Sequence, residues 1–140
     1  MAKVIIDANV MISAAFGGKP LDAVVLAFRD HEIYLSEEII RELREVFQKL
    51  SKKLSDEKIH FLREKVQQLT SLAHCIPVSA KVVLSRDAKD DHYLSLCREA
   101  EADFLITGDK DLLSLSTEDL KAKGISCRIL SPNSFLEITR

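Results

Sequence analysis

Short apolar runs alternate with longer helical patterns along the whole chain. Five of these runs are bounded by polar residues, as is typical of buried β-strands. We expect the strands at residues 4–6, 33–35, 75–78, 103–107 and 125–130. Because helices separate successive strands, the order of elements indicates repeated βαβ units.

The clearest helix begins after Ser36, a residue type that favours the N-cap position. From Ile39 to Leu50 its apolar residues recur every three or four positions, which is the helical period. A second apolar stripe follows Ser55, so the two segments are expected to form a helical hairpin. Further helices are expected after Pro20, after the polar loop at 85–91, near 112–115, at 117–123 and after Pro132.

This alternation requires a largely parallel sheet with helices on both faces. The chain has 140 residues, the length of one domain, and it contains neither a repeat nor a linker-like tract. We therefore expect a three-layer α/β/α fold with a central, mainly parallel sheet, forming a single domain over residues 1–140. In such sheets ligands bind at the carboxyl ends of the strands.

Composition excludes several functional classes. A 46% apolar and 30% charged chain is not disordered, and a net charge of −2 offers no bulk attraction to nucleic acid or anionic membranes. Three widely spaced cysteines form no CxxC pair, and the early Asp7 interrupts the first apolar run, so we expect a cytoplasmic protein without a membrane segment. Four histidines without ligand spacing argue against a zinc site, and nucleotide-binding and nucleophile-elbow motifs are absent.

Acidic residues follow two of the expected strands. Asp7 ends the first apolar run, and Asp109 follows the fourth through Gly108, so both carboxylates should meet at one edge of the sheet. The alternative for Asp7 is a cap on the next turn. The alternative for Asp109 is a helix N-cap, although Asp111 fits that role better.

Two more acids have helical positions from which they can face this edge. Glu42 lies just outside the apolar arc of its helix, although a solvated surface glutamate explains it equally well. Asp90 shares a helical face with Leu94, whereas Asp91 points toward the flank. Either could instead be a first-turn acid that complements the helix dipole.

Four carboxylates in one cleft repel one another unless a cation compensates them. Oxygen ligands favour Mg²⁺ or Mn²⁺ over zinc. The sequence therefore predicts a site for one of these two ions.

These residues resemble those of the PIN-domain family of metal-dependent ribonucleases, in particular its VapC-like branch, the toxins of toxin–antitoxin pairs. The resemblance covers nearly the whole chain. Its carriers are the segment 4–9, Ser36 with Glu42, the segment 86–91 and the run 102–113, which contains the most specific stretch, Ile-Thr-Gly-Asp-Lys-Asp-Leu-Leu.

The resemblance implies an acidic pocket that binds one or two Mg²⁺ or Mn²⁺ ions and cleaves RNA phosphodiesters. By motif position, the catalytic and metal-binding roles fall on Asp7, Glu42, Asp90 and Asp109. Supporting roles fall on Asn9, Ser36, Asp91, Thr107 and Asp111, and the choice between Asp90 and Asp91 as third ligand stays open. A small antitoxin partner and a homodimer are also implied.

On a chain of net charge −2, contacts with RNA phosphates must come from individual basic side chains. The candidates are Lys19, Arg41, Lys89 and Lys110, although an ordinary solvated surface residue explains each of them better than an RNA contact does. Two other functions stay open. One is a PIN-like module that only binds RNA or protein, and the other is a receiver-like signalling domain, disfavoured because Ser131-Pro132 follows the last strand without a lysine.

Overall fold

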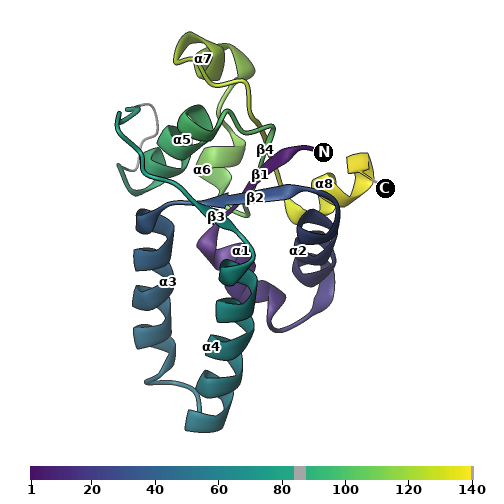
Figure 1. Cartoon of the computed structure of the whole chain (residues 1–140), viewed down its shortest axis with the longest axis vertical. Coiled ribbons are helices and arrows are strands. Elements are labelled where there is room, and N and C mark those ends of the chain that lie inside the picture. The colour runs from purple at the N-terminus through teal and green to yellow at the C-terminus, as the bar shows by residue number, and fades with distance from the viewer. Residues whose placement is uncertain (84–87, 140) are drawn as a thin grey trace.

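The computed structural model describes residues 1–83 and 88–139, and within them the strands form one all-parallel sheet (Figure 1). The strand order is β3-β2-β1-β4-β5. The strands are β1 (Lys3–Ile6), β2 (Glu32–Leu35), β3 (His74–Cys75), β4 (Phe104–Ile106) and β5 (Arg128–Leu130). The expected parallel α/β architecture is confirmed.

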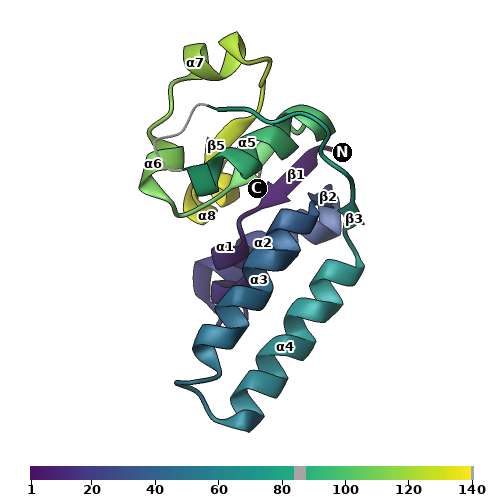
Figure 2. The same ribbon diagram turned by 90° about the vertical axis from the view of Figure 1, so that its left-hand side faces the viewer.

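Helices connect these strands and cover the sheet (Figures 1 and 2). Their bounds are α1 (Ala8–Ala14), α2 (Gly18–Asp30), α3 (Glu37–Leu50), α4 (Asp56–Ser71), α5 (Ala88–Ala100), α6 (Lys110–Leu113), α7 (Thr117–Ala122) and α8 (Pro132–Thr139). Both views show α3 and α4 side by side, projecting away from the sheet as the expected hairpin.

The order of the strands reverses between β1 and β4. From β1 the chain moves outward through β2 to β3, then crosses back through α5 to place β4 on the other side of β1. In open parallel sheets such a reversal opens a crevice at the carboxyl ends of the two strands. This crevice is where a ligand site is expected.

Register places the residues after β1 and β4 next to each other. Ile6 pairs with Ile106, and the backbone N–H of Asp7 donates to the carbonyl of Ile106 at 2.9 Å. Asp7 and Thr107 therefore leave the sheet side by side. The strands themselves are held by a core of fully buried side chains that includes Ile5 and Leu105.

Several local expectations differ from the structure. The expected strand at 125–130 is shortened to Arg128–Leu130, and the expected helix near 112–115 runs over Lys110–Leu113. The segment directly after Asp7 was not expected to be helical, but it forms α1 because Val10, Met11 and Ile12 all find buried positions. Of the expected strand at 75–78, only Cys75 belongs to β3, and the backbone N–H of Ile76 adds one hydrogen bond to Leu35 of β2 at 2.9 Å. The expected polar loop at 85–91 gives way to α5 at residue 88, and residues 85–87 lie outside the described part of the chain.

Among the described residues, no single helix is both long enough and apolar enough to cross a membrane. The bent pair α1 and α2 together reach that length and composition, with an angle of 109° between the two helices.

Candidate active site

The crevice between β1 and β4 contains a pocket of about 320 Å³. Asp7 and Asp109, the two acids that follow these strands, both line it. Its other lining residues are Asn9, Val10, Ser13, Pro20, Gly108 and Pro132. The structure thus brings the two strand-end carboxylates to one edge of the sheet.

Asp7 is only 5% exposed, and hydrogen bonds engage both of its oxygens. Its Oδ2 accepts from the Thr107 hydroxyl at 2.7 Å, and its Oδ1 accepts from the backbone N–H of Asn9 at 2.9 Å. Burial raises the pKa of Asp7, although the hydrogen bonds from Thr107 and Asn9 oppose this effect. Asp7 is also the N-cap of α1, so the capping alternative holds together with the position in the pocket.

Glu42 extends from α3, whose first turn is capped by the buried Ser36 through a 3.4 Å hydrogen bond to the N–H of Ile39. Two consecutive residues of α5 contact its carboxylate. His92 Nε2 bonds to Glu42 Oε1, and the Tyr93 hydroxyl donates to Glu42 Oε2 at 2.7 Å. Glu42 is therefore engaged with α5 and is not a solvated surface glutamate.

Tyr93 also connects Glu42 to Asp7. Its hydroxyl lies 3.2 Å from Asp7 Oδ1 and accepts the backbone N–H of Ala8 at 3.0 Å. We call Asp7 and Glu42 the bridged pair. Sequence reasoning missed both His92 and Tyr93. Tyr93 lies on the apolar face of its helix, as a core residue does. The sequence feature that could have identified the two residues is their position directly after Asp90 and Asp91.

A second group of acids lies at the same edge. Asp90, Asp109 and Asp111 each present a carboxylate oxygen within 4.8 Å of the others, and we call them the acidic trio. Asp109 is the N-cap of α6, accepting from the N–H groups of Asp111 at 2.8 Å and Leu112 at 3.2 Å. The expectation that Asp111 fits this cap better is wrong, because the turn after Gly108 already places Asp109 at the helix start.

Thr107 joins the bridged pair to the acidic trio. It is fully buried, and its hydroxyl donates to Asp7 Oδ2 while accepting the backbone N–H of Asp109 at 3.0 Å. The supporting role that the family resemblance implies for Thr107 stays a prediction.

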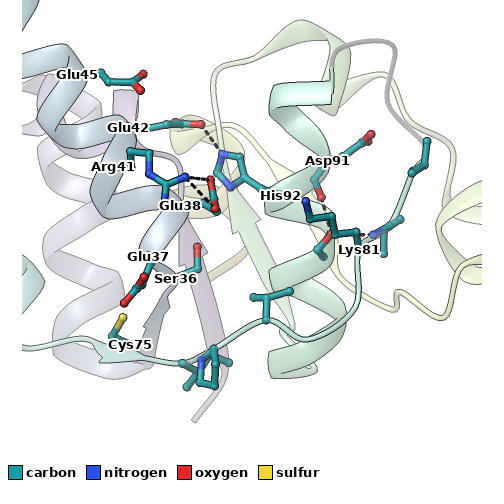
Figure 3. A pocket seen from close by; sticks show the side chains of 16 residues that line it. Ser36, Glu37, Glu38, Arg41, Glu42, Glu45, Cys75, Lys81, Asp91 and His92 are labelled. Carbon is teal, nitrogen blue, oxygen red and sulfur yellow. Dashed lines mark hydrogen bonds and ion pairs between the residues drawn. The ribbon is translucent and has the colours of Figure 1, made fainter.

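Asp90 and Asp91 point to different surroundings. Asp90 belongs to the acidic trio, whereas Asp91 lines a larger pocket of about 940 Å³ together with Glu42 and His92. Figure 3 shows Glu42 and His92 facing each other in that pocket. The arrangement favours Asp90 as a metal ligand, and that role stays a prediction.

The basic side chains that are candidates for RNA contact differ in their exposure and in their ion pairs. Lys19 and Lys110 are exposed, next to residues that line the smaller pocket. Arg41 is paired with Glu38 at 3.1 Å in the larger pocket (Figure 3). The side chain of Lys89 lies outside the described part of the chain.

The donor set fits a hard divalent cation. The acidic trio offers only carboxylate oxygens, with Asp90 buried, Asp109 half-buried and Asp111 exposed. Such donors suit Mg²⁺ or Mn²⁺, since zinc sites are built mainly from nitrogen and sulfur ligands. Of the predicted ligands, Asp90 and Asp109 belong to the trio, and Asp111, predicted only as a supporting residue, joins them.

A family model described as "PIN domain" matches residues 3–111, which include both strand ends and every predicted site residue. The chain belongs to the PIN domain family. A protein of Methanocaldococcus jannaschii described as uncharacterized is 32% identical to it, over 96% of this chain and 90% of the relative. The family resemblance found in the sequence is thus confirmed.

Two solved structures share the PIN fold of this chain at lower identity. VapBC2 from Rickettsia felis, bound to a DNA fragment from its promoter, superimposes with a TM-score of 0.59 at 16% identity, covering 92% of this chain and 98% of that one. A domain of a functionally unknown protein from M. jannaschii gives a TM-score of 0.55 at 17% identity, covering 93% and 91%. Both matches support the fold.

Proposed function

We propose that this PIN-domain protein is a divalent-metal-dependent endoribonuclease. The observation that carries the proposal is the convergence of carboxylates from separate segments at the crevice between β1 and β4. The acidic trio lies within 4.8 Å there, and Asp7 lines the same pocket as Asp109. Membership of the PIN family supports a nuclease rather than a binding module.

In this proposal, Asp90 and Asp109 hold Mg²⁺ or Mn²⁺ together with Asp7 and Glu42, and Asp111 supplements them. When bound, such an ion activates water and offsets the charge that develops on a phosphodiester in the transition state. The residues of this chain orient the ligands. Thr107 fixes one oxygen of Asp7, and α6 fixes one oxygen of Asp109 through two backbone N–H groups.

The substrate in this proposal is RNA, contacted by the exposed Lys19 and Lys110. We further propose that the protein is a cytoplasmic toxin restrained by a small antitoxin and acts as a homodimer. The likeness of the fold to VapBC2 and the sequence resemblance to VapC-like toxins support the antitoxin. The homodimer rests on the sequence resemblance.

The test is cleavage of a mixed single-stranded RNA by the purified protein with Mn²⁺, with Mg²⁺ and with EDTA. We expect cleavage with either ion, none with EDTA, and none by Asp109→Asn or Asp7→Asn. Asp119→Asn, an exposed acid on α7 far from the crevice, is the matched control and should cleave like the wild type (Figure 1). Equal cleavage by the wild type and both site variants would contradict the proposal.

A wild type that binds RNA without cutting it under any ion would favour the alternative of a binding module. Binding is measured separately, by fluorescence anisotropy of a labelled RNA in EDTA. Cleavage of single-stranded DNA at the same rate would keep the nuclease but remove its preference for RNA.

A further inference from the structure

One buried hydroxyl joins three segments of the chain at the bridged pair. Tyr93 is only 2% exposed and comes from α5. Its hydroxyl contacts Glu42 of α3 at 2.7 Å, Asp7 at the end of β1 at 3.2 Å and the backbone N–H of Ala8 in α1 at 3.0 Å. Core packing alone does not require a hydroxyl here, because phenylalanine would fill the same volume.

The hydroxyl has one proton and two carboxylate neighbours. The shorter distance assigns that proton to Glu42, while the N–H of Ala8 donates to the phenolic oxygen. A phenol is protonated at neutral pH, so the hydroxyl is available as a donor to Glu42.

His92 holds the opposite oxygen of the same carboxylate. Its Nε2 bonds to Glu42 Oε1, and its ring packs against that of Tyr93 with centroids 4.1 Å apart. Because the two neighbours are consecutive in α5, they approach Glu42 from one helix and leave its side chain little rotational freedom. A free glutamate on a helix surface samples many rotamers.

We propose that Tyr93 is a positioning residue that fixes the Glu42 carboxylate beside that of Asp7, so that both carboxylates are in place before a divalent cation binds. The inference rests on the proposed function, because it concerns Glu42 as a ligand of that cation. Tyr93 acts only through Glu42 and Asp7. Residues that orient metal ligands in this way typically change metal affinity by about 10- to 100-fold when altered.

The experiment is calorimetric titration of Mn²⁺ into the full chain and into Tyr93→Phe, which keeps the ring and removes the hydroxyl. We expect Tyr93→Phe to bind Mn²⁺ about 10-fold more weakly. Tyr34→Phe is the matched control: it also removes a hydroxyl that bonds to a glutamate, Glu32 at 2.9 Å, but on β2 and outside the site. Its Mn²⁺ affinity should equal that of the wild type.

A double-mutant cycle separates positioning from a general effect on the fold. In a Glu42→Gln background, adding Tyr93→Phe should weaken Mn²⁺ binding by much less than 10-fold, because the group that Tyr93 positions is already altered. Thermal melts identify a temperature at which all four proteins are folded, and the titrations are made there.

The outcomes distinguish this inference from the proposed function. Unchanged Mn²⁺ affinity in Tyr93→Phe, or a full 10-fold loss that persists in the Glu42→Gln background, overturns the positioning role and leaves the nuclease proposal intact. A wild type that binds neither Mn²⁺ nor Mg²⁺ overturns both.

Discussion

The bridged pair and the acidic trio lie at the same sheet edge but are held in different ways. Side chains from other elements hold the pair: Thr107 bonds to Asp7, while His92 and Tyr93 bond to Glu42. In the trio, Asp109 accepts backbone N–H groups of the helix that it begins. Contacts between distant elements thus position Glu42 and one oxygen of Asp7, while the other oxygen of Asp7 accepts the N–H of Asn9 in the helix that Asp7 begins, and Asp109 is positioned by local chain geometry.

This difference separates two contributions to a metal site. Removing one partner of a buried side-chain hydrogen bond leaves the other partner unsatisfied and lowers the stability of the fold. Closely spaced carboxylates repel one another and depend on a cation for compensation. We therefore expect changes in the trio to act mainly on cation binding, and changes around the pair to act on both stability and cation binding.

The largest expected effect is that of Asp109→Asn. Asparagine is a good N-cap, so α6 should persist while one anionic ligand is lost. We expect the rate of RNA cleavage with Mn²⁺ to fall at least about 100-fold, since even a mutation of a residue that only orients a metal ligand can lower activity by that much. The measurement is a single-turnover cleavage rate, with far-UV circular dichroism to verify the fold. A rate within a few-fold of the wild type would remove Asp109 from the ligand set.

Next in size is the effect of Thr107→Val, which breaks the link between the pair and the trio at nearly constant volume. Asp7 Oδ2 loses its hydroxyl donor, and the N–H of Asp109 loses its acceptor. Because Thr107 is fully buried, we expect the free energy of unfolding to fall by about 1–3 kcal/mol. Thr107→Ser keeps the hydroxyl and is the control. Urea melts in EDTA measure both, and a free energy of unfolding of Thr107→Val equal to that of the wild type would contradict this role of the hydroxyl.

A smaller effect is the pH-dependent stabilisation expected from Asp7→Asn. Burial raises the pKa of Asp7, so the fold favours its protonated form and the ionised form costs stability as pH rises through the raised pKa. Replacing Asp7 by asparagine should raise the melting temperature of the metal-free protein at neutral pH. Below the ordinary value of 3.8 the advantage should vanish, because both folded and unfolded wild type are then protonated. Melts in EDTA across pH 3–8 test the sign, and a neutral-pH melting temperature below that of the wild type would contradict it.

The smallest effect concerns the exposed Lys110 of α6, beside the acidic trio. If it contacts a phosphate, Lys110→Gln should lower RNA affinity a few-fold and reduce the slope of log affinity against log salt by about 0.7. Lys58→Gln, on α4, is the control. Fluorescence anisotropy in EDTA measures both slopes, and identical slopes would make Lys110 an ordinary solvated lysine.

The sequence predicted the parallel sheet and the meeting of Asp7 with Asp109 because both depend on local pattern and on a general rule of sheet topology. It could not predict the partners of Glu42. In the sequence pattern Tyr93 is typical of a core residue on an apolar helix face. Its hydrogen bond to Asp7 joins residues 86 positions apart in the sequence. Whether a buried hydroxyl finds a carboxylate depends on how α3, α5 and α1 pack, which periodicity does not encode.

The order of the strands also sets when this site can exist during synthesis. β1 is made first, yet the strand that completes the crevice, β4, comes after residue 103, and the acids of the trio come at 90, 109 and 111. A ribosome that has released only residues 1–83 has therefore produced three strands and no acidic trio. Since domains fold as units, the complete carboxylate set assembles only after residue 111 has left the ribosome, and chains terminated before that point lack it.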